Sequence, residues 1–308
     1  MNKIVAICGP TAVGKTAYSI EIAKRFDGEI VSCDSMQLYK YMDIGSAKPS
    51  PDELNQVKHH LIGIVDPSEM FSVAKYKELA SSSIDDILSR GKLPIIAGGT
   101  GLYLDALLFD LDFAAAPSDD SLRDELYKIA EEKGNLELYA ILNKCDPDSA
   151  KRIHPNNVRR VVRAIESAKS GNKLKDFAKD LSLNDKYEFI LIGLRRDREE
   201  LYDRINRRVD VLVKEGLFEE VKMLREMGLS ESDISMKGIG YKEVLAYFDG
   251  EYDLETAIDT IKKNTRHFAK RQITWLKRYD DMKWFDLSES KDDKDSIREI
   301  ITWLEKNL

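Results

Sequence analysis

A short apolar run, Lys3–Cys8, leads directly into Gly9-Pro10-Thr11-Ala12-Val13-Gly14-Lys15-Thr16, which matches the phosphate-loop pattern G-x-x-x-x-G-K-[ST]. A helical pattern over residues 17–26 follows the loop. This order suits phosphate binding because glycines let backbone N–H groups close around phosphate oxygens and the helix N-terminus adds a favourable dipole. Lys15 can place a positive charge on the terminal phosphate, and Thr16 can offer a hydroxyl to Mg²⁺. The feature predicts an α/β fold whose first loop binds a diphosphate or triphosphate group.

Further strand-sized runs indicate that the loop belongs to a parallel sheet. They are nearly continuously apolar, as strands covered on both faces are, and they occupy Glu29–Cys33, His60–Val65, Leu93–Ala97 and Glu188–Leu194. We therefore predict a P-loop α/β core with a parallel sheet flanked by helices. This core is expected to comprise residues 1–112 and 186–308, with helices at its C-terminal end. The tail after residue 279 carries no motif.

A different pattern separates the last two predicted strands. Residues 113–185 are rich in charge and have the period of helices, with breaks at Gly134, Pro147, Pro155 and Gly171. A chain of 308 residues is long enough for one large domain and a smaller one. The segment 113–185 is therefore predicted to be an all-helical insertion domain.

The composition excludes several classes of protein. Charged residues make up 33% and hydrophobic residues 43% of the chain, as in globular proteins. The longest apolar runs have the length of strands, so no membrane-spanning segment is expected. The N-terminus runs straight into the first strand without a signal-peptide pattern, and the three cysteines have neither metal-ligand nor disulfide spacing. These features predict a cytoplasmic protein.

The charge is unevenly distributed, although the chain as a whole has a net charge of −7. Residues 151–163 contain five basic and no acidic side chains, and residues 262–278 contain seven basic and again no acidic ones. Either run could be a solvated helix face. Two such runs, about a hundred residues apart, favour binding to a nucleic acid.

Asp34 stands directly after the second predicted strand. Because the carboxyl ends of parallel strands border the ligand crevice, we expect Asp34 to face whatever the phosphate loop binds. It could bind Mg²⁺, act as a general base toward an acceptor, or be only a solvent-exposed turn residue. The fourth strand ends in Gly98-Gly99-Thr100-Gly101, without the acidic residue that typical NTPases use for their metal. This absence argues against a motor or switch ATPase.

Several motifs occur in a fixed order along the chain. After the phosphate loop come Asp-Ser-Met-Gln-Leu-Tyr (34–39), Asp-Ile-Gly-Ser-Ala-Lys-Pro (43–49), Gly-Gly-Thr-Gly-Leu-Tyr (98–103), His-Pro-Asn-Asn (154–157), Gly-Ile-Gly-Tyr (238–241) and Thr-Arg-His-Phe-Ala-Lys-Arg-Gln-Ile-Thr-Trp (265–275). This series resembles the bacterial tRNA dimethylallyltransferases over residues 4 to about 278. Gly63 departs from the family pattern, because an acidic residue is expected there, and the contacts of that turn are in question.

The resemblance implies transfer of a dimethylallyl group from dimethylallyl diphosphate to N6 of the adenosine on the 3′ side of the tRNA anticodon, with Mg²⁺ as cofactor. The phosphate loop, Gly9–Thr16, would then hold the diphosphate, with Thr16 on the metal. Asp34 matches the family's proposed general base, and Thr11 lines the same site. Arg208 matches the position for diphosphate stabilisation, although Arg204 lies four residues earlier on the same predicted helix face and could be confused with it.

The resemblance also implies a set of tRNA-contacting positions. They are Asp34, Ser35, Met36, Gln37, Thr100, Arg123, Arg159, Arg160, Arg163, Lys237, Gly238, Gly240, Tyr241, Lys242, Arg266, Lys270, Arg271 and Gln272. Tyr241, Phe268 and Trp275 could stack on bases, with core packing favoured for the last two. The helical insertion is expected to clamp the anticodon stem of the tRNA, and a monomer without a protein partner is expected.

Two alternatives stay open from the residues alone. A small-molecule kinase of the nucleoside-monophosphate type also combines a phosphate loop, an arginine-rich helical lid and an α/β core. A non-catalytic RNA-binding module would leave the phosphate loop without a purpose. The two acid-free basic runs favour a tRNA substrate over a small acceptor.

Overall fold

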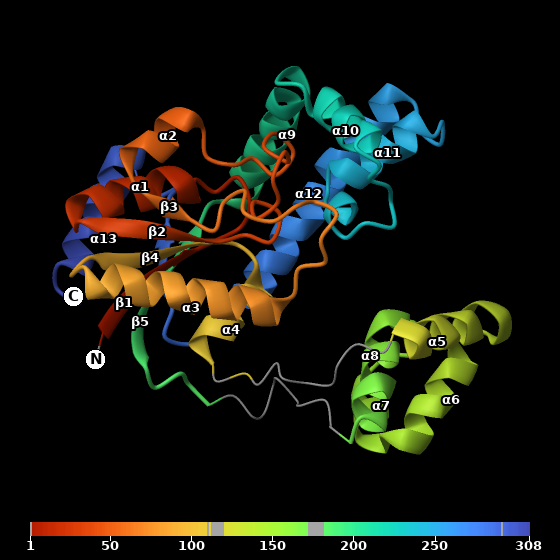
Figure 1. Ribbon diagram of the computed structural model, residues 1–308. Coiled ribbons are helices and arrows are strands. Elements are labelled where there is room, and N and C mark those ends of the chain that lie inside the picture. Colours follow the sequence, from red (N-terminus) through yellow and green to blue (C-terminus); the bar gives the residue numbers. More distant parts are fainter. Residues whose placement is uncertain (1, 110, 112–119, 172–181, 291) are drawn as a thin grey trace. The chain divides into compact units, whose positions relative to one another are not determined.

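A single parallel sheet forms the centre of the protein in a computed structural model, which describes residues 2–109, 111, 120–171, 182–290 and 292–308 (Figure 1). Within these residues the sheet has six strands, all paired in parallel. In sheet order they are β3 (His59–His60), β2 (Gly28–Cys33), β4 (Leu93–Gly98), β1 (Asn2–Cys8), β5 (Tyr187–Arg195) and β6 (Lys283–Asp286). The predicted parallel α/β class is confirmed.

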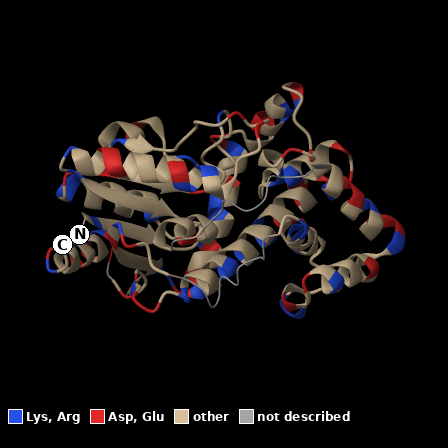
Figure 2. Cartoon of the chain, turned by 60° about the horizontal axis from the view of Figure 1, so that its bottom comes forward, with Lys and Arg blue, Asp and Glu red and all other residues tan. Residues whose placement is uncertain are grey.

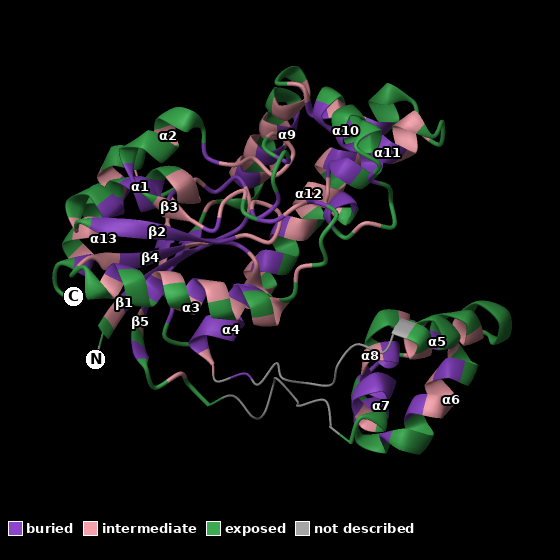
Figure 3. Ribbon diagram, in the orientation of Figure 1, coloured by how far each residue is buried: buried purple, intermediate pink, exposed green. Residues whose placement is uncertain are grey.

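Helices cover both faces of this sheet, which explains why its central strands are apolar throughout. On one face, α1 (Lys15–Arg25) packs against β2, β4 and the last helix, α13 (Asp293–Leu304). On the other face, α3 (Val73–Ser89) contacts β2, β4 and α4 (Gly101–Leu108). Figure 3 shows the strands as buried between mostly exposed outer helix faces.

The remaining helices of this unit follow β2 and β5. They are α2 (Pro51–Gln56), α9 (Arg198–Lys214), α10 (Leu217–Glu226), the short 3₁₀ helix η1 (Ser235–Lys237), α11 (Tyr241–Phe248) and α12 (Leu254–Leu276). Asp197 caps α9, as its position before an amphipathic run predicts, because its side chain accepts the N–H groups of Glu199 and Glu200. Leu201, Ile205 and Val209 form the buried stripe of that helix.

Two compact units make up the chain. One comprises residues 1–108 and 184–308, and the other comprises residues 109–183. The smaller unit contains α5 (Asp120–Lys133), α6 (Asn135–Cys145), α7 (Pro147–Arg152) and α8 (Val158–Lys169), which enclose a core of their own. Gly134 and Pro147 stand at the starts of α6 and α7. The predicted boundary at residues 112 and 113 lies outside the described residues.

Two details of the predicted sheet were wrong. The third strand, expected at His60–Val65, is only His59–His60, because Leu61 and Gly63 take left-handed backbone angles (φ 62° and 61°) that turn the chain away. The sixth strand, β6, lies in the tail where no motif was found, and it pairs with the edge of β5.

Candidate active site and basic groove

The carboxyl ends of three neighbouring strands meet at one edge of the sheet. Gly98, at the end of β4, pairs with Cys8 of β1 on one side and with Cys33 of β2 on the other. The phosphate loop, the turn that starts at Asp34 and the glycine-rich turn through Thr100 therefore begin side by side. Sheet register thus brings together three motifs that are far apart in the sequence.

The phosphate loop depends on tight backbone geometry. Ala12 and Gly14 have φ angles of 64° and 117°, and α1 begins immediately afterwards at Lys15. A Cβ on Gly9 would lie 2.7 Å from the carbonyl oxygen of Leu194, so that position has no room for a side chain. Val13 is buried in the core. The loop can therefore address a ligand mainly with its backbone N–H groups and with the side chains at its helical end.

Lys15 supplies the positive charge of the loop. Its Nζ donates to the carbonyl oxygens of Gly9 and Pro10 at 3.0 and 2.9 Å. Burial lowers the pKa of the ammonium to about 8, against the opposing attraction of Asp34. A partly buried cation of this kind interacts more strongly with a phosphate group than an exposed one, because less solvent screens it.

One cavity of about 260 Å³ brings the predicted catalytic residues together. Thr11, Lys15, Thr16, Asp34 and Arg208 all line it. The carboxylate of Asp34 is oriented by the N–H of Met36, which donates to its Oδ1 at 2.9 Å. An anionic group, two cations and two hydroxyls thus surround a space large enough for a diphosphate.

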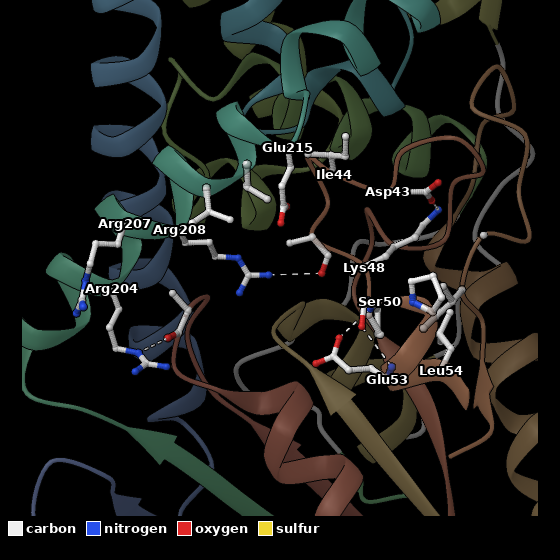
Figure 4. Close-up of a pocket in the computed structure, with 18 residues that line it drawn as sticks. Asp43, Ile44, Lys48, Ser50, Glu53, Leu54, Arg204, Arg207, Arg208 and Glu215 are labelled. Carbon is white, nitrogen blue, oxygen red and sulfur yellow. Dashed lines mark hydrogen bonds and ion pairs between the residues drawn. The ribbon is translucent and has the colours of Figure 1, made fainter. Parts of the chain in front are cut away.

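The structure distinguishes the two arginines of α9. Arg208 faces the cavity, and its Nη2 lies 3.4 Å from the carbonyl oxygen of Ala47. Arg204 instead donates its Nε to the carbonyl oxygen of Ala12 at 3.0 Å and so braces the phosphate loop. Figure 4 shows both bonds. Burial lowers the pKa of Arg208, and Asp34 opposes that shift.

A second cavity, of about 950 Å³, shares Ala47, Lys48 and Arg208 with the first (Figure 4). Its walls come mainly from residues 43–54 and from α9, with Ala12, Ile62, Gly63 and Glu215 completing the lining. Neither this cavity nor the position of Lys48 in its wall was predicted from the sequence. The only signal was that Lys48 belongs to the motif at 43–49.

The turn after β2 is fixed by hydrogen bonds to neighbouring segments. Thr100 accepts the N–H of Ser35 with its Oγ1 at 3.0 Å. Gln37 donates to the carbonyl oxygen of Ala47 at 3.2 Å and lines the small cavity beside Lys15 and Thr16. Gln37, predicted to contact tRNA, therefore lies in the wall of the cavity, and the bond to Thr100 fixes Ser35, the residue that follows Asp34.

Thr16 and Asp34 also suit a magnesium ion. Among the described residues, no three His, Cys, Asp or Glu side chains gather as a protein-only metal site would need. Mg²⁺ usually takes one or two protein ligands and completes its shell with water and phosphate oxygens. Thr16 and Asp34 offer such oxygens from the walls of one small cavity. The residues present therefore fit a metal that is held jointly with a diphosphate.

Gln272 does not have the RNA-facing position expected of it. Its side chain is buried, with Oε1 accepting the N–H of Thr11 at 2.8 Å and Nε2 donating to the carbonyl oxygen of Gly99 at 2.9 Å. A Cβ on Gly99 would overlap that amide nitrogen. Gln272 therefore ties α12 to the phosphate loop and to the end of β4, and the prediction that it contacts tRNA is corrected.

Tyr241 was expected to be available for stacking on a base, and this was wrong. The ring is fully buried, and its hydroxyl donates to Oε1 of Glu220 at 2.8 Å. Around it, Gly238 passes close to Met36, and Gly240 donates its N–H to Glu243 at 2.7 Å. Lys237 and Lys242, at either end of this turn, are exposed. Only the lysines of this segment remain suited to RNA.

The basic run 262–278 covers the second half of α12 and the two residues after it, and several of its members are bonded within the unit. Lys262 pairs with Asp210, Arg266 donates to Asn206, and Arg278 pairs with the buried Asp105. Lys270 and Arg271 are exposed and line a groove of about 580 Å³ with His267, Thr274, Trp275 and Arg278. Trp275 is half-buried with Arg278 4.4 Å above its ring. This groove combines positive charge with an aromatic edge.

The basic run of the smaller unit divides in the same way. Arg159 and Arg160 are exposed on α8. Glu166, only 3% exposed, attracts Arg163 at 3.6 Å and Arg123 at 2.5 Å. Arg123 and Arg163 therefore neutralise a buried carboxylate within this unit, and the free charges on its surface are fewer than the sequence suggests. Figure 2 shows basic and acidic residues interspersed over the chain.

No helix among the described residues is both long and apolar enough to cross a membrane.

The chain is similar to known proteins over nearly its whole length. The family described as IPP transferase matches residues 37–279. A tRNA dimethylallyltransferase of Alkaliphilus metalliredigens (strain QYMF) is 51% identical over 308 residues, which are 100% of this chain and 97% of that protein.

Two solved structures also match. One is the tRNA isopentenylpyrophosphate transferase of Bacillus halodurans (45% identity, TM-score 0.76, 99% and 96% of the two chains). The other is a eukaryotic dimethylallyltransferase acting on tRNA (29% identity, TM-score 0.84, 100% and 80%).

Proposed function

This chain belongs to the IPP transferase family, and from that membership we propose that it transfers a dimethylallyl group from dimethylallyl diphosphate to tRNA. The acceptor in this proposal is N6 of the adenosine 3′-adjacent to the anticodon. The observation that carries it is the shared cavity in which the phosphate-loop residues Lys15 and Thr16 face Asp34 and Arg208. A kinase of the nucleoside-monophosphate type is not favoured, because relatives about 50% identical over the full chain are named tRNA dimethylallyltransferases.

The geometry supports a division of roles within one substitution reaction. The adenine N6 forms a bond to C1 of the dimethylallyl group as the bond from C1 to the diphosphate oxygen breaks, and the diphosphate leaves with the electron pair. Lys15, Arg208 and the loop N–H groups stabilise the charge that develops on the leaving oxygen. Asp34 takes the proton that the amine loses, which helps because the ring withdraws the lone pair of that amine.

Thr16 and Asp34 are the residues that would hold Mg²⁺. When bound, the ion would supply further neutralisation of the leaving diphosphate. Asp34 then has two candidate roles, as a metal ligand and as a base, and a Mg²⁺ titration of Asp34→Asn distinguishes them.

The RNA side of the proposal rests on exposed charge. Lys270 and Arg271 on α12, Lys237 and Lys242 beside η1, and Arg159 and Arg160 on α8 are positioned to contact phosphates. In this proposal the helical unit 109–183 clamps the anticodon stem, and the target base leaves its stack to reach Asp34, which costs a few kcal/mol. We further propose that the enzyme works as a monomer in the cytoplasm, where tRNA is found.

Radiolabelled dimethylallyl diphosphate and unmodified tRNA provide the test. Label should enter tRNA that carries an adenosine beside the anticodon, and a matched tRNA with guanosine at that position should remain unlabelled. A parallel incubation with ATP and nucleoside monophosphates should give no phosphoryl transfer. Phosphoryl transfer without prenyl transfer would overturn the proposal in favour of the kinase.

A further inference from the structure

Glu220 is a buried carboxylate that the proposed chemistry does not use. It lies in the first turn of α10 and is 7% exposed. Its Oε2 accepts the backbone N–H groups of Asp43 and Ile44, both at 2.7 Å, and its Oε1 accepts the N–H of Gly45 at 2.9 Å. The hydroxyl of Tyr241 donates to Oε1 as well, at 2.8 Å. Four donors therefore converge on one side chain.

This arrangement needs an ionised carboxylate. A carboxylate has about four acceptor positions and no donor, so four incoming donors match its capacity. An amide in the same place would direct an N–H₂ group toward at least one of those donors. Burying a charge is unfavourable unless it is fully hydrogen-bonded, and here the bonds make up for lost water.

Two glycine-containing motifs are explained by this contact. A Cβ on Gly45 would lie 2.6 Å from Cζ of Tyr241, so the tyrosine ring can pack there only against glycine. Gly45 belongs to the motif at 43–49, and Tyr241 follows the motif glycine at 240. The two motifs thus meet at Glu220, which belongs to neither.

The segment that Glu220 holds continues into the cavity wall. Lys48 donates its Nζ to Oδ1 of Asp43 and to the carbonyl oxygen of Tyr39, both at 2.6 Å. Ala47 accepts from Arg208. Figure 4 shows Asp43, Ile44 and Lys48 on the wall opposite the arginines of α9. Fixing residues 43–45 therefore fixes the residues that face Arg208.

We propose that Glu220, together with Tyr241, is a positioning residue that holds the segment 43–49 as the wall of the diphosphate cavity. This inference rests on the proposed function. Glu220 lines neither of the two cavities beside Arg208. Its role is to fix the positions of Lys48 and of the Ala47 carbonyl group relative to Arg208, so that the cavity is preformed when the prenyl diphosphate binds.

Glu220→Gln tests the inference in steady-state assays, with Glu219→Gln as the matched control, an exposed glutamate next to it on the same helix. Loss of charge-assisted hydrogen bonds should raise the KM for dimethylallyl diphosphate roughly 10- to 100-fold. The affinity for tRNA should stay within about two-fold, and the control should resemble the unsubstituted enzyme. Tyr241→Phe removes one donor of four and should raise the same KM by a smaller factor, roughly three- to ten-fold.

Amide hydrogen exchange provides a measurement that does not depend on the reaction. The N–H groups of Asp43, Ile44 and Gly45 should exchange faster in Glu220→Gln and in Tyr241→Phe than in Glu219→Gln. Unchanged exchange at these three amides would overturn the inference, as would a loss confined to tRNA affinity. Absence of prenyl transfer in the unsubstituted protein would instead count against the proposed function, and the exchange experiment would still decide the role of Glu220.

Discussion

The charged residues around the phosphate loop and those on α12 differ in their exposure to solvent and in their bonding. Lys15 and Arg208 are partly buried and line one cavity with Asp34, and each makes a defined bond to a named backbone atom. Lys270 and Arg271 are exposed along a helix groove. Buried charges interact strongly and depend on position, whereas exposed charges are screened by salt and act through their number. Substitutions in the two regions should therefore differ in size and in salt dependence.

The largest effect is expected at Asp34. As a general base it acts when the amine attacks, so Asp34→Asn should lower kcat about 10²- to 10⁴-fold with little change in the affinity for either substrate. Single-turnover transfer at saturating substrates, repeated across a Mg²⁺ titration, measures this. Recovery of the rate at high Mg²⁺ would assign Asp34 to the metal instead.

Lys15→Ala should have the next largest effect. Removing this partly screened cation from the leaving diphosphate should reduce kcat/KM for dimethylallyl diphosphate about 10²- to 10³-fold. The affinity for tRNA, measured by filter binding, should be nearly intact because the exposed charges are untouched. A large loss of tRNA affinity would show that the two regions are not separate.

The pH dependence follows from the lowered pKa of Lys15. Its ammonium loses a proton as the pH rises through about 8, so the charge on the loop is present below that pH and lost above it. kcat/KM for the prenyl diphosphate should fall toward ten-fold per pH unit above pH 8, because this parameter reports the free enzyme. A profile that stays flat to pH 10 would contradict this assignment.

The exposed charges of α12 should act through salt dependence. Replacing Lys270 and Arg271 together by alanine should reduce the slope of log K for tRNA against log salt by roughly 1.4 to 1.8, if each contacts one phosphate. Lys294 and Lys306, two exposed lysines near the C-terminus, offer a matched double substitution that should leave the slope unchanged. Equal slopes in all three proteins would make the α12 run an ordinary solvated face.

The smallest difference is expected within α8. Arg160 is exposed, whereas Arg163 lies 3.6 Å from the buried Glu166. Arg160→Gln should reduce the salt slope by roughly 0.7 to 0.9, and Arg163→Gln should reduce it by less than half as much. The same salt titration measures both. A larger effect at Arg163 would mean that its pairing with Glu166 does not withhold it from RNA.

Local sequence predicted the parts of the site that a continuous segment builds. The phosphate loop needs its glycines, Lys15 and Thr16 at fixed spacing, and Asp34 needs only to follow a strand. Glu220, Gln272 and Tyr241 could not be placed in this way. The hydrogen-bond partners of Gln272 lie 173 and 261 residues away in the sequence. Glu220 is separated by 175 to 177 residues from the backbone N–H groups of residues 43–45 that it accepts. Only tertiary packing decides whether such a side chain is buried.

The same reason explains the errors in the sheet and in the basic runs. β3 was predicted too long because apolar character extends past two left-handed residues, and β6 was missed because an edge strand of four residues carries little pattern. The runs at 151–163 and 262–278 contain no acidic residue, yet Glu166, Asp210 and Asp105 reach them from outside. The absence of acid in a segment therefore does not predict free charge.

The contact between Gln272 and Gly99 constrains how this protein can evolve. The two residues are 173 positions apart, and any side chain at 99 would displace the amide that also holds the N–H of Thr11. A mutation at either position alone gives a protein in which the hydrogen bond from Thr11 to Gln272 is lost and the phosphate loop is no longer held. A substitution at one of the two positions is therefore not expected to be neutral unless the other position changes with it. Recombination between the codons for residues 99 and 272 would preserve this contact only if both parental genes encode glycine at 99 and glutamine at 272.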